Sequence, residues 1–157
     1  MSNILKFLFT YRKTNPALGL LLARIALGIV FIMHGYDKLF VAGIDSTTAF
    51  FERISIPLPY YNALLVSNLE FFGGILLILG LFTRPLAFIF ALDMLVAGLT
   101  VHWQNGFWVR GGNSGYEYVM VLMIVSFTLF TAGPGAISLD RLWFRSKPNP
   151  VPSQPYE

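Results

Sequence analysis

Cysteine is absent from the 157 residues of this chain, and charged residues make up only 12% of it. Without a thiol, the chain itself cannot carry disulfide chemistry, thiolate metal ligation or a persulfide intermediate. Its charged fraction is about half of the roughly 25% typical of soluble domains. Hydrophobic side chains instead make up 55% of the sequence. The composition therefore predicts an integral protein of the lipid bilayer, with room for one domain.

The net charge of +3 is spread along the chain. Basic residues lie mainly beside apolar segments rather than in one patch, so nucleic acid is not an expected partner. The N-terminal lead, the turn at Arg84 and the C-terminal segment hold seven lysines and arginines, whereas the two opposite loops hold three. The positive-inside rule then predicts that both termini are cytoplasmic.

Four apolar segments predict an all-α, integral membrane four-helix bundle. The expected spans are residues 17–36, 61–82, 85–102 and 116–132, with short interfacial helices at 47–54 and 139–145. These spans approach or reach the ~20 residues that cross a bilayer core. Residues 1–16 are expected to form an interfacial lead, residues 17–145 the transmembrane domain with its C-terminal helix, and residues 146–157, with four prolines, a disordered tail.

Glu70 lies within the second span. A carboxylate there costs about 2.5–3.5 kcal/mol on insertion scales, so it should face protein or a water-filled cavity. Gly73 and Gly74 follow on the same helix face, where a neighbouring helix or a ligand can approach the backbone. An ion pair with a cation on another helix explains the same carboxylate equally well.

Depth along the spans groups the other charges. At about 1.5 Å per residue, Arg24 and Asp93 lie ~10–12 Å from the cytoplasmic side and are level enough to pair. The outward half holds Glu70, Glu117, His34 and His102. Three carboxylates against one arginine leave an excess, so at least one carboxyl is protonated or bonded to a group that the sequence does not contain.

The two histidines fit two roles. His34 and His102 could form hydrogen bonds at the interface, or could join Glu117 in a metal site or proton relay; no ligand spacing supports the metal, and none is predicted. On an ideal helix Asp93 and His102 lie about 180° apart, so they share one site only if that helix bends or ends before His102. Phe71 and Trp103 are typical of packing and interfacial belts, although a flat ring ligand would need such walls.

The spacing of these residues suggests an internal repeat. Arg24 precedes His34 by ten residues, and Asp93 precedes His102 by nine. Two helical hairpins of similar plan, related by an axis along the membrane normal, would produce this pattern.

Several short motifs, taken in order, resemble the DoxX family. They are Arg24 with Leu27-Gly28, His34–Leu39, Leu69–Gly74, Leu79–Arg84, Met94, Ala97, His102 and Gly106-Phe107, Glu117, Gly133-Pro134-Gly135 and Ser138-Leu139-Asp140. The likeness covers about residues 17–142 and implies a four-helix protein of the bacterial inner membrane, related to the membrane subunit of a thiosulfate:quinone oxidoreductase. It also singles out Arg24, His34, Lys38, Glu70, Arg84, His102 and Glu117; Asp93 is added on physical grounds.

The leading hypothesis, favoured by this resemblance, is quinone-linked redox chemistry. Its catalytic candidates are Glu70, Arg24, Glu117, His34 and His102, and its cofactor-binding candidates are Gly73, Gly74, Asp93, Phe71 and Trp103. The chain has neither a haem motif nor a flavin fingerprint, so the electrons would need a protein partner or an exogenous oxidant. The alternatives are a non-catalytic membrane partner of a redox or stress-response complex, and transport of protons or a small ion.

Overall fold

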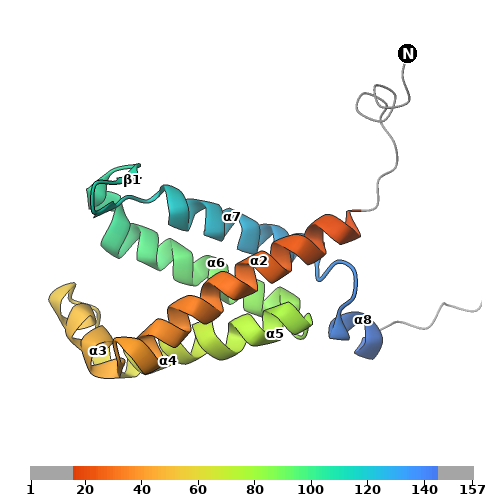
Figure 1. Cartoon of the computed structure of the whole chain (residues 1–157), viewed down its shortest axis with the longest axis horizontal. Coiled ribbons are helices and arrows are strands. Elements are labelled where there is room, and N and C mark those ends of the chain that lie inside the picture. Colours follow the sequence, from red (N-terminus) through yellow and green to blue (C-terminus); the bar gives the residue numbers. More distant parts are fainter. Residues whose placement is uncertain (1–15, 145–157) are drawn as a thin grey trace, which may run out of the picture.

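The computed structural model describes residues 16–144 and is built from helices (Figure 1). The α-helices are α2 (Ala17–Tyr36), α3 (Ile44–Arg53), α4 (Pro59–Asn68), α5 (Gly74–Leu79), α6 (Thr83–Ala97), α7 (Glu117–Ala132) and α8 (Leu139–Trp143). Three π-helices continue or link them, namely η1 (Asp37–Val41), η2 (Leu69–Gly73) and η3 (Gly98–His102), and η4 (Trp103–Asn105) is a 3₁₀ turn. A two-stranded hairpin, β1 (Val109–Arg110) with β2 (Asn113–Ser114), precedes α7. The all-α prediction is confirmed. The predicted tail over residues 146–157 and, apart from Pro16, the predicted lead over residues 1–16 lie outside the described residues.

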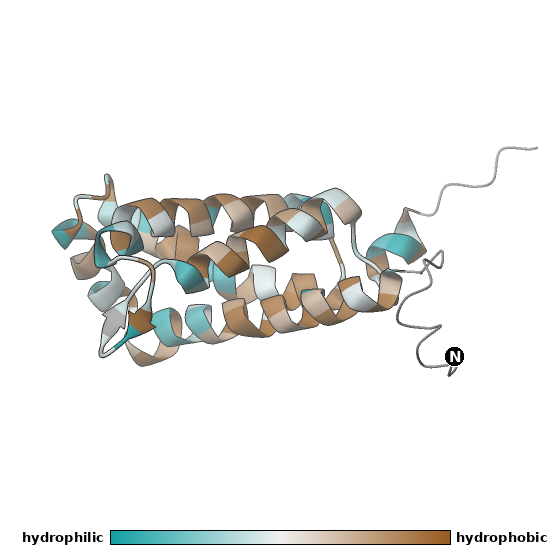
Figure 2. Ribbon diagram, turned by 90° about the horizontal axis from the view of Figure 1, so that it is seen from above, coloured by the Kyte–Doolittle hydropathy of each residue, from teal (hydrophilic) through white to brown (hydrophobic). Residues whose placement is uncertain are grey.

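Three continuous helices are long and apolar enough to cross a membrane: Ala17–Val41, Pro59–Leu79 and Thr83–Asn105. The helix at Glu117–Ala132 is apolar but shorter, with 16 residues. Residues along the helices are mostly hydrophobic, whereas hydrophilic residues gather toward the two ends of the bundle (Figure 2). This distribution matches a bilayer with water on either side.

The second span ends earlier than residue 82, and the third begins earlier than residue 85. Gly80 has φ +69° and Phe82 has φ +53°, values that break the helix and reverse the chain. A glycine adopts this conformation without steric cost. The side chain of Asp140 then accepts hydrogen bonds from the backbone N–H of Phe82, at 2.8 Å, and of Thr83, at 2.9 Å. A carboxylate at the start of α6 satisfies two of its free N–H groups, so the third helix begins at Thr83.

Two helical hairpins make up the bundle. The α2 helix packs along α4, η2 and α5, while α6 packs along α7 (Figure 1). Between the hairpins, the rings of Phe31 and Phe90 stack with centroids 3.8 Å apart, and Leu27, Leu77 and Leu129 are buried around them. The expected hairpins are therefore present, and their relation by a membrane-normal axis stays a prediction.

The segment after α7 folds back across one end of the bundle. The N–H of Ala136 donates to the carbonyl of Ala17 at 2.8 Å, and the N–H of Asp140 donates to the carbonyl of Gly80 at 2.8 Å. Ser138 caps α8, since its hydroxyl accepts from the N–H of Arg141. These bonds attach α8 to the beginning of α2 and to the turn between α5 and α6.

Close contact between α2 and α5 depends on glycine. A Cβ added at Gly74 would lie 2.8 Å from the carbonyl oxygen of Gly28 and 2.9 Å from the backbone N of Ile32. We predict that Gly74→Ala lowers the free energy of unfolding by about 1–3 kcal/mol, because backbone atoms must move apart. Denaturant unfolding in detergent measures the change. Gly19→Ala is the matched control, since no atom lies within 4 Å of its added Cβ; equal destabilisation by both variants would contradict the close contact.

Candidate ligand cavity

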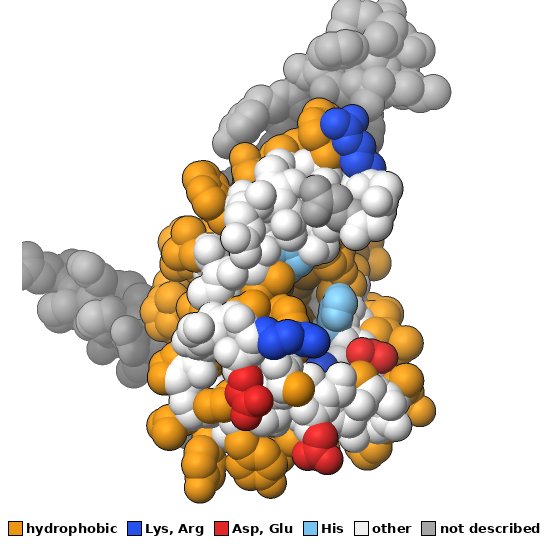
Figure 3. Space-filling model, turned by 90° about the vertical axis from the view of Figure 1, so that its left-hand side faces the viewer, with side chains coloured by type: hydrophobic (Ala, Val, Ile, Leu, Met, Phe, Trp, Pro, Cys, Tyr) orange, Lys and Arg blue, Asp and Glu red, His pale blue; other side chains and the backbone are white. Residues whose placement is uncertain are grey.

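A cavity of about 560 Å³ lies inside the half of the bundle that carries α3 and the β-hairpin. Helices α2, α4, α6 and α7 form its walls, and α3 with the segment after it contributes Phe50, Phe51, Ile54, Ile56 and Pro57. Its polar lining consists of His34, Lys38, Asn62, Glu70, Asp93, Thr100, His102 and Tyr118. The space-filling view from this end shows a hollow with histidine and basic atoms beside apolar surface (Figure 3). The chain therefore places a small group of ionisable side chains within an otherwise apolar cavity.

Glu70 and Lys38 form an ion pair at the wall of this cavity. Lys38 Nζ donates to Glu70 Oε2, and this is the one salt bridge among residues 16–144. The Glu70 side chain is 4% exposed, whereas that of Lys38 is 25% exposed. Glu70 thus pairs with a cation on another helix and also lines the cavity, so both interpretations of this carboxylate, ion pair and cavity residue, are correct.

Asp93 adds a second carboxylate beside this pair. Its side chain lines the same cavity as Glu70 and Lys38. The atom Oδ2 is buried and has no hydrogen-bond partner within the described part of the chain. A buried carboxylate oxygen without a donor is costly, and a ligand hydroxyl or a proton would relieve that cost. The cavity therefore contains two carboxylates, Glu70 and Asp93, beside one lysine, Lys38, and the predicted excess of carboxylates lies here.

Each π-helix carries one ionisable residue of the cavity. Lys38 lies in η1, Glu70 in η2 and His102 at the end of η3. Single turns of π-helix inside longer helices occur frequently at functional sites. The α-helical geometry of α6 stops at Ala97, and the wider turn of η3 changes the angular spacing beyond it. As a result Asp93 and His102 line the same cavity, although an ideal helix would place them on opposite faces.

The two histidines enter the cavity lining from different helices. The ring of His34 on α2 lies 6.4 Å from that of Tyr118 on α7, centroid to centroid. His102 Nδ1 lies 2.6 Å from the carbonyl oxygen of Ser114. Because a carbonyl can only accept, Nδ1 is the donor in this contact. Among residues 16–144 no three histidine, aspartate or glutamate side chains are arranged to hold a metal ion.

Arg24 lies outside the cavity, and its predicted ion pair with Asp93 was wrong. The guanidinium is buried and donates to the carbonyl oxygens of Pro134, at 2.6 Å, and Ile137, at 2.7 Å. Counting depth along ideal helices could not include the C-terminal segment, which folds back and brings these carbonyls to Arg24. The arginine therefore secures the far end of the bundle, and Lys38 is the cation beside the carboxylates.

Glu117 and Trp103 also lie outside the cavity lining. The carboxylate of Glu117 accepts a hydrogen bond from the N–H of Val109 at 2.7 Å and so holds the β-hairpin loop. The Trp103 ring stacks on Tyr116, with centroids 5.2 Å apart, and is largely exposed. Both residues organise the loop between α6 and α7 near the cavity mouth.

The remaining cofactor candidates serve helix packing in this structure. Gly74 lies against the backbone of α2, and a Cβ added at Gly73 would lie 3.0 Å from the Phe90 ring. The Phe71 ring packs against Phe40 and Phe72 at centroid distances of 5.5 and 5.1 Å. None of the three lines the cavity.

Several cavity residues escaped the sequence interpretation. Tyr118 follows the candidate Glu117 directly, and its ring lies near that of His34. Phe50 and Phe51 belong to the expected interfacial helix, but only its fold-back over the bundle brings them to the cavity. Lys38, in contrast, was singled out by the family resemblance, and its position four residues after His34 puts both residues on the same helix face.

A sequence model described as DoxX matches residues 19–103. The chain belongs to the DoxX family. The matched stretch contains five of the ionisable cavity residues, namely His34, Lys38, Glu70, Asp93 and His102, whereas α7 lies beyond it. This DoxX protein is a multi-pass membrane protein in which the family region supplies most of the cavity.

Among curated relatives, the chain is 35% identical over 132 residues to the Bacillus subtilis protein named "Putative oxidoreductase CatD", covering 84% of this chain and 92% of that protein. It is 35% identical over 142 residues to inner membrane protein YphA of Escherichia coli K12, covering 88% and 99% respectively. Inner membrane protein YqjF of the same organism is 33% identical over 131 residues, covering 83% and 95%. No solved structure matches the chain.

The ion pair yields a stability prediction. Lys38→Met should lower the free energy of unfolding by about 3 kcal/mol, because it leaves the buried Glu70 carboxylate without its cation. Adding Glu70→Gln should recover much of that loss, since the amide carries no charge. A double-mutant cycle measured by denaturant unfolding gives the coupling. Independent, additive effects of the two substitutions would contradict the pairing.

The position of Arg24 yields a second prediction. Arg24→Met should free the segment around Pro134 and Ile137, because two charge-assisted hydrogen bonds are lost. Trypsin should then cleave after Arg141 several-fold faster than in the parent protein. Asp93→Asn is the discriminating control and should leave this cleavage unchanged. Equal acceleration by both variants would instead support an Arg24–Asp93 pair.

Proposed function

We propose that this DoxX protein binds a quinol-type molecule in the cavity and accepts its protons as it is oxidised. The observation that carries the proposal is the unpaired Oδ2 of Asp93 beside the Lys38–Glu70 pair, inside a cavity with apolar walls. Its volume of about 560 Å³ lies within the range of about 300–1,000 Å³ usual for small-molecule sites.

The cavity suits a flat ring with hydroxyl groups. Phe31, Phe50, Phe51 and Tyr118 supply aromatic walls, against which a ring can stack or pack edge-on. The carboxylates of Asp93 and Glu70 can accept from ring hydroxyls, and the Lys38 ammonium can donate to a ring oxygen. The apolar side chains of Val66, Val96 and Val101 leave space for hydrocarbon substituents.

The proton chemistry follows from this arrangement. Oxidation of a quinol to a quinone releases two protons and two electrons. Asp93 takes the first proton as general base, and Glu70 takes the second, with Lys38 adjusting its ion pair and His34 connecting the cavity to water. The two electrons pass to a redox centre of a partner protein, because the chain contains no cysteine and no cofactor motif that could store them.

Two further observations support the proposal. The relative CatD is named an oxidoreductase. The relatives YphA and YqjF are named inner membrane proteins, and quinols dissolve in such membranes. We place this chain in the bacterial inner membrane with both termini cytoplasmic, which puts α3 and the cavity mouth on the outer side.

Quinone binding by the purified protein tests the site. We predict that Asp93→Asn and Glu70→Gln each weaken binding of a short-chain quinol analogue by at least about tenfold, because each removes a charged hydrogen-bond acceptor. Equilibrium dialysis in detergent, with extraction and absorbance of the bound analogue, measures the affinity.

Glu117→Gln is the matched carboxylate control, since Glu117 lies outside the cavity and glutamine keeps an acceptor for Val109 N–H. This variant should bind like the parent protein. A folded parent protein that binds no quinol analogue would rule out the proposal and favour the non-catalytic partner role. Proton flux into proteoliposomes in the absence of quinone, lost in Asp93→Asn, would favour transport.

A further inference from the structure

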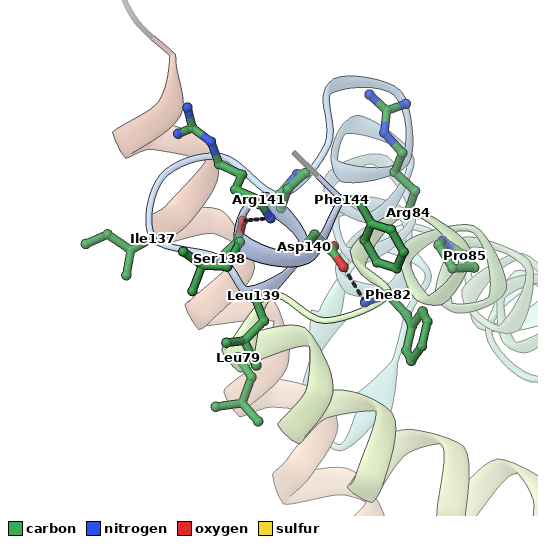
Figure 4. Close-up of a pocket in the computed structure, with 12 residues that line it drawn as sticks. Leu79, Phe82, Arg84, Pro85, Ile137, Ser138, Leu139, Asp140, Arg141 and Phe144 are labelled. Atoms are coloured by element: carbon green, nitrogen blue, oxygen red, sulfur yellow. Dashed lines mark hydrogen bonds between the residues drawn. The ribbon is translucent and has the colours of Figure 1, made fainter. Parts of the chain in front are cut away.

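A second cavity, of about 920 Å³, lies at the opposite end of the bundle between α8 and the turn that joins α5 to α6. Its lining combines Arg84, Asp140 and Arg141 with apolar residues of α5, the turn and α8. In the close-up, Arg84 and Arg141 extend on either side of Asp140, while Leu79 and Phe82 lie on the other side of the cavity (Figure 4). The cavity thus separates a charged edge from an apolar edge.

Positive charge at this end exceeds negative charge. Three arginines meet here, Arg84 and Arg141 in the lining and Arg24 directly behind it, because a Cβ added at Gly80 would contact both Arg24 and Ser138. Asp140 is the one carboxylate here within residues 16–144, and it already accepts from two backbone N–H groups. Arginine cannot release its proton, so a net positive charge persists.

Backbone carbonyls orient these arginines without neutralising them. Arg84 Nη1 donates to the carbonyl oxygen of Phe130 at 3.1 Å, and Arg141 Nη1 lies 3.5 Å from that of Gly135. A guanidinium has five N–H donors, so most of them remain available to an anion. The other end of the bundle has the reverse balance, since Asp37, Asp45, Glu52, Glu70, Asp93 and Glu117 there outnumber Lys38, Arg53 and Arg110.

The apolar edge of the cavity is open to the surface. Leu79 and Phe82 are about half exposed, and Leu142 and Phe144 of the α8 region are mostly exposed. These side chains lie where the membrane-spanning helices end, next to the charged edge. Hydrocarbon chains would cover them, whereas a soluble anion would leave them in water.

We propose that this cavity binds an anionic phospholipid, with the phosphate at the charged edge that carries Arg84 and Arg141 and the acyl chains along Leu79, Phe82 and Phe144. Basic pockets between transmembrane helices on the cytoplasmic side are suited to such head groups. The lipid would hold α8 against the bundle and offset the excess arginine charge. This site is independent of the quinol cavity at the other end.

Native mass spectrometry of the full chain tests this site. The protein is equilibrated with equal amounts of phosphatidylglycerol and phosphatidylethanolamine, and the retained lipids are counted. We expect preferential retention of one phosphatidylglycerol, with Arg84→Gln and Arg141→Gln each reducing that preference about fivefold, as expected for loss of one cation near a charged surface. Arg84→Lys should retain most of it, because the positive charge remains.

Arg53→Gln and Arg110→Gln are matched controls, since they remove one arginine each from the opposite end. They should leave the preference unchanged. Equal retention of the two lipids, or an equal loss in the controls, would overturn the proposal, and displacement of the lipid by millimolar inorganic phosphate would reduce the site to a simple anion site. If Arg84→Gln does not fold, the exposed Arg141→Gln still decides the outcome.

Discussion

The ion pair between Lys38 and Glu70 is the constraint on which the rest of the bundle depends. Charges inside a membrane protein need partners, and the partner of Glu70 comes from the end of the neighbouring span. To meet, the extension of α2 must lie along the middle of the second span, which also brings the glycine faces of α2 and α5 together. The pair fixes one hairpin, and α6 then brings Asp93 against it.

The π-helices carry three of the polar side chains that the bundle presents to one cavity. Lys38, Glu70 and His102 each lie within one of these widened turns, and all three line the cavity from different helices. Single π-helical turns inside longer helices occur frequently at functional sites. The proposed quinol site would therefore coincide with the places where the helices depart from regular geometry.

The two ends of the molecule carry opposite charge. Carboxylates dominate the end with the 560 Å³ cavity, and arginines dominate the end with α8. This polarity accords with the expected orientation, with the basic end in the cytoplasm. It also separates the two proposed sites, since the proposed proton chemistry uses the carboxylates at one end and the proposed lipid site uses the arginines at the other.

Composition and the four apolar segments determined the class of fold, because a chain with so few charges must place its helices in lipid. They also indicated Glu70, His34 and His102 as candidate site residues, since ionisable residues are rare in apolar spans and costly to place there. Which cation lies beside the buried carboxylates was decided only by tertiary structure: it is Lys38, because the C-terminal segment folds back and satisfies Arg24, the predicted partner of Asp93, with carbonyls. That Asp93 and His102 line one cavity likewise depends on the π-helical turn η3. Depth and residue spacing counted along the sequence assume a regular α-helix, and they contain no information about where the helix widens.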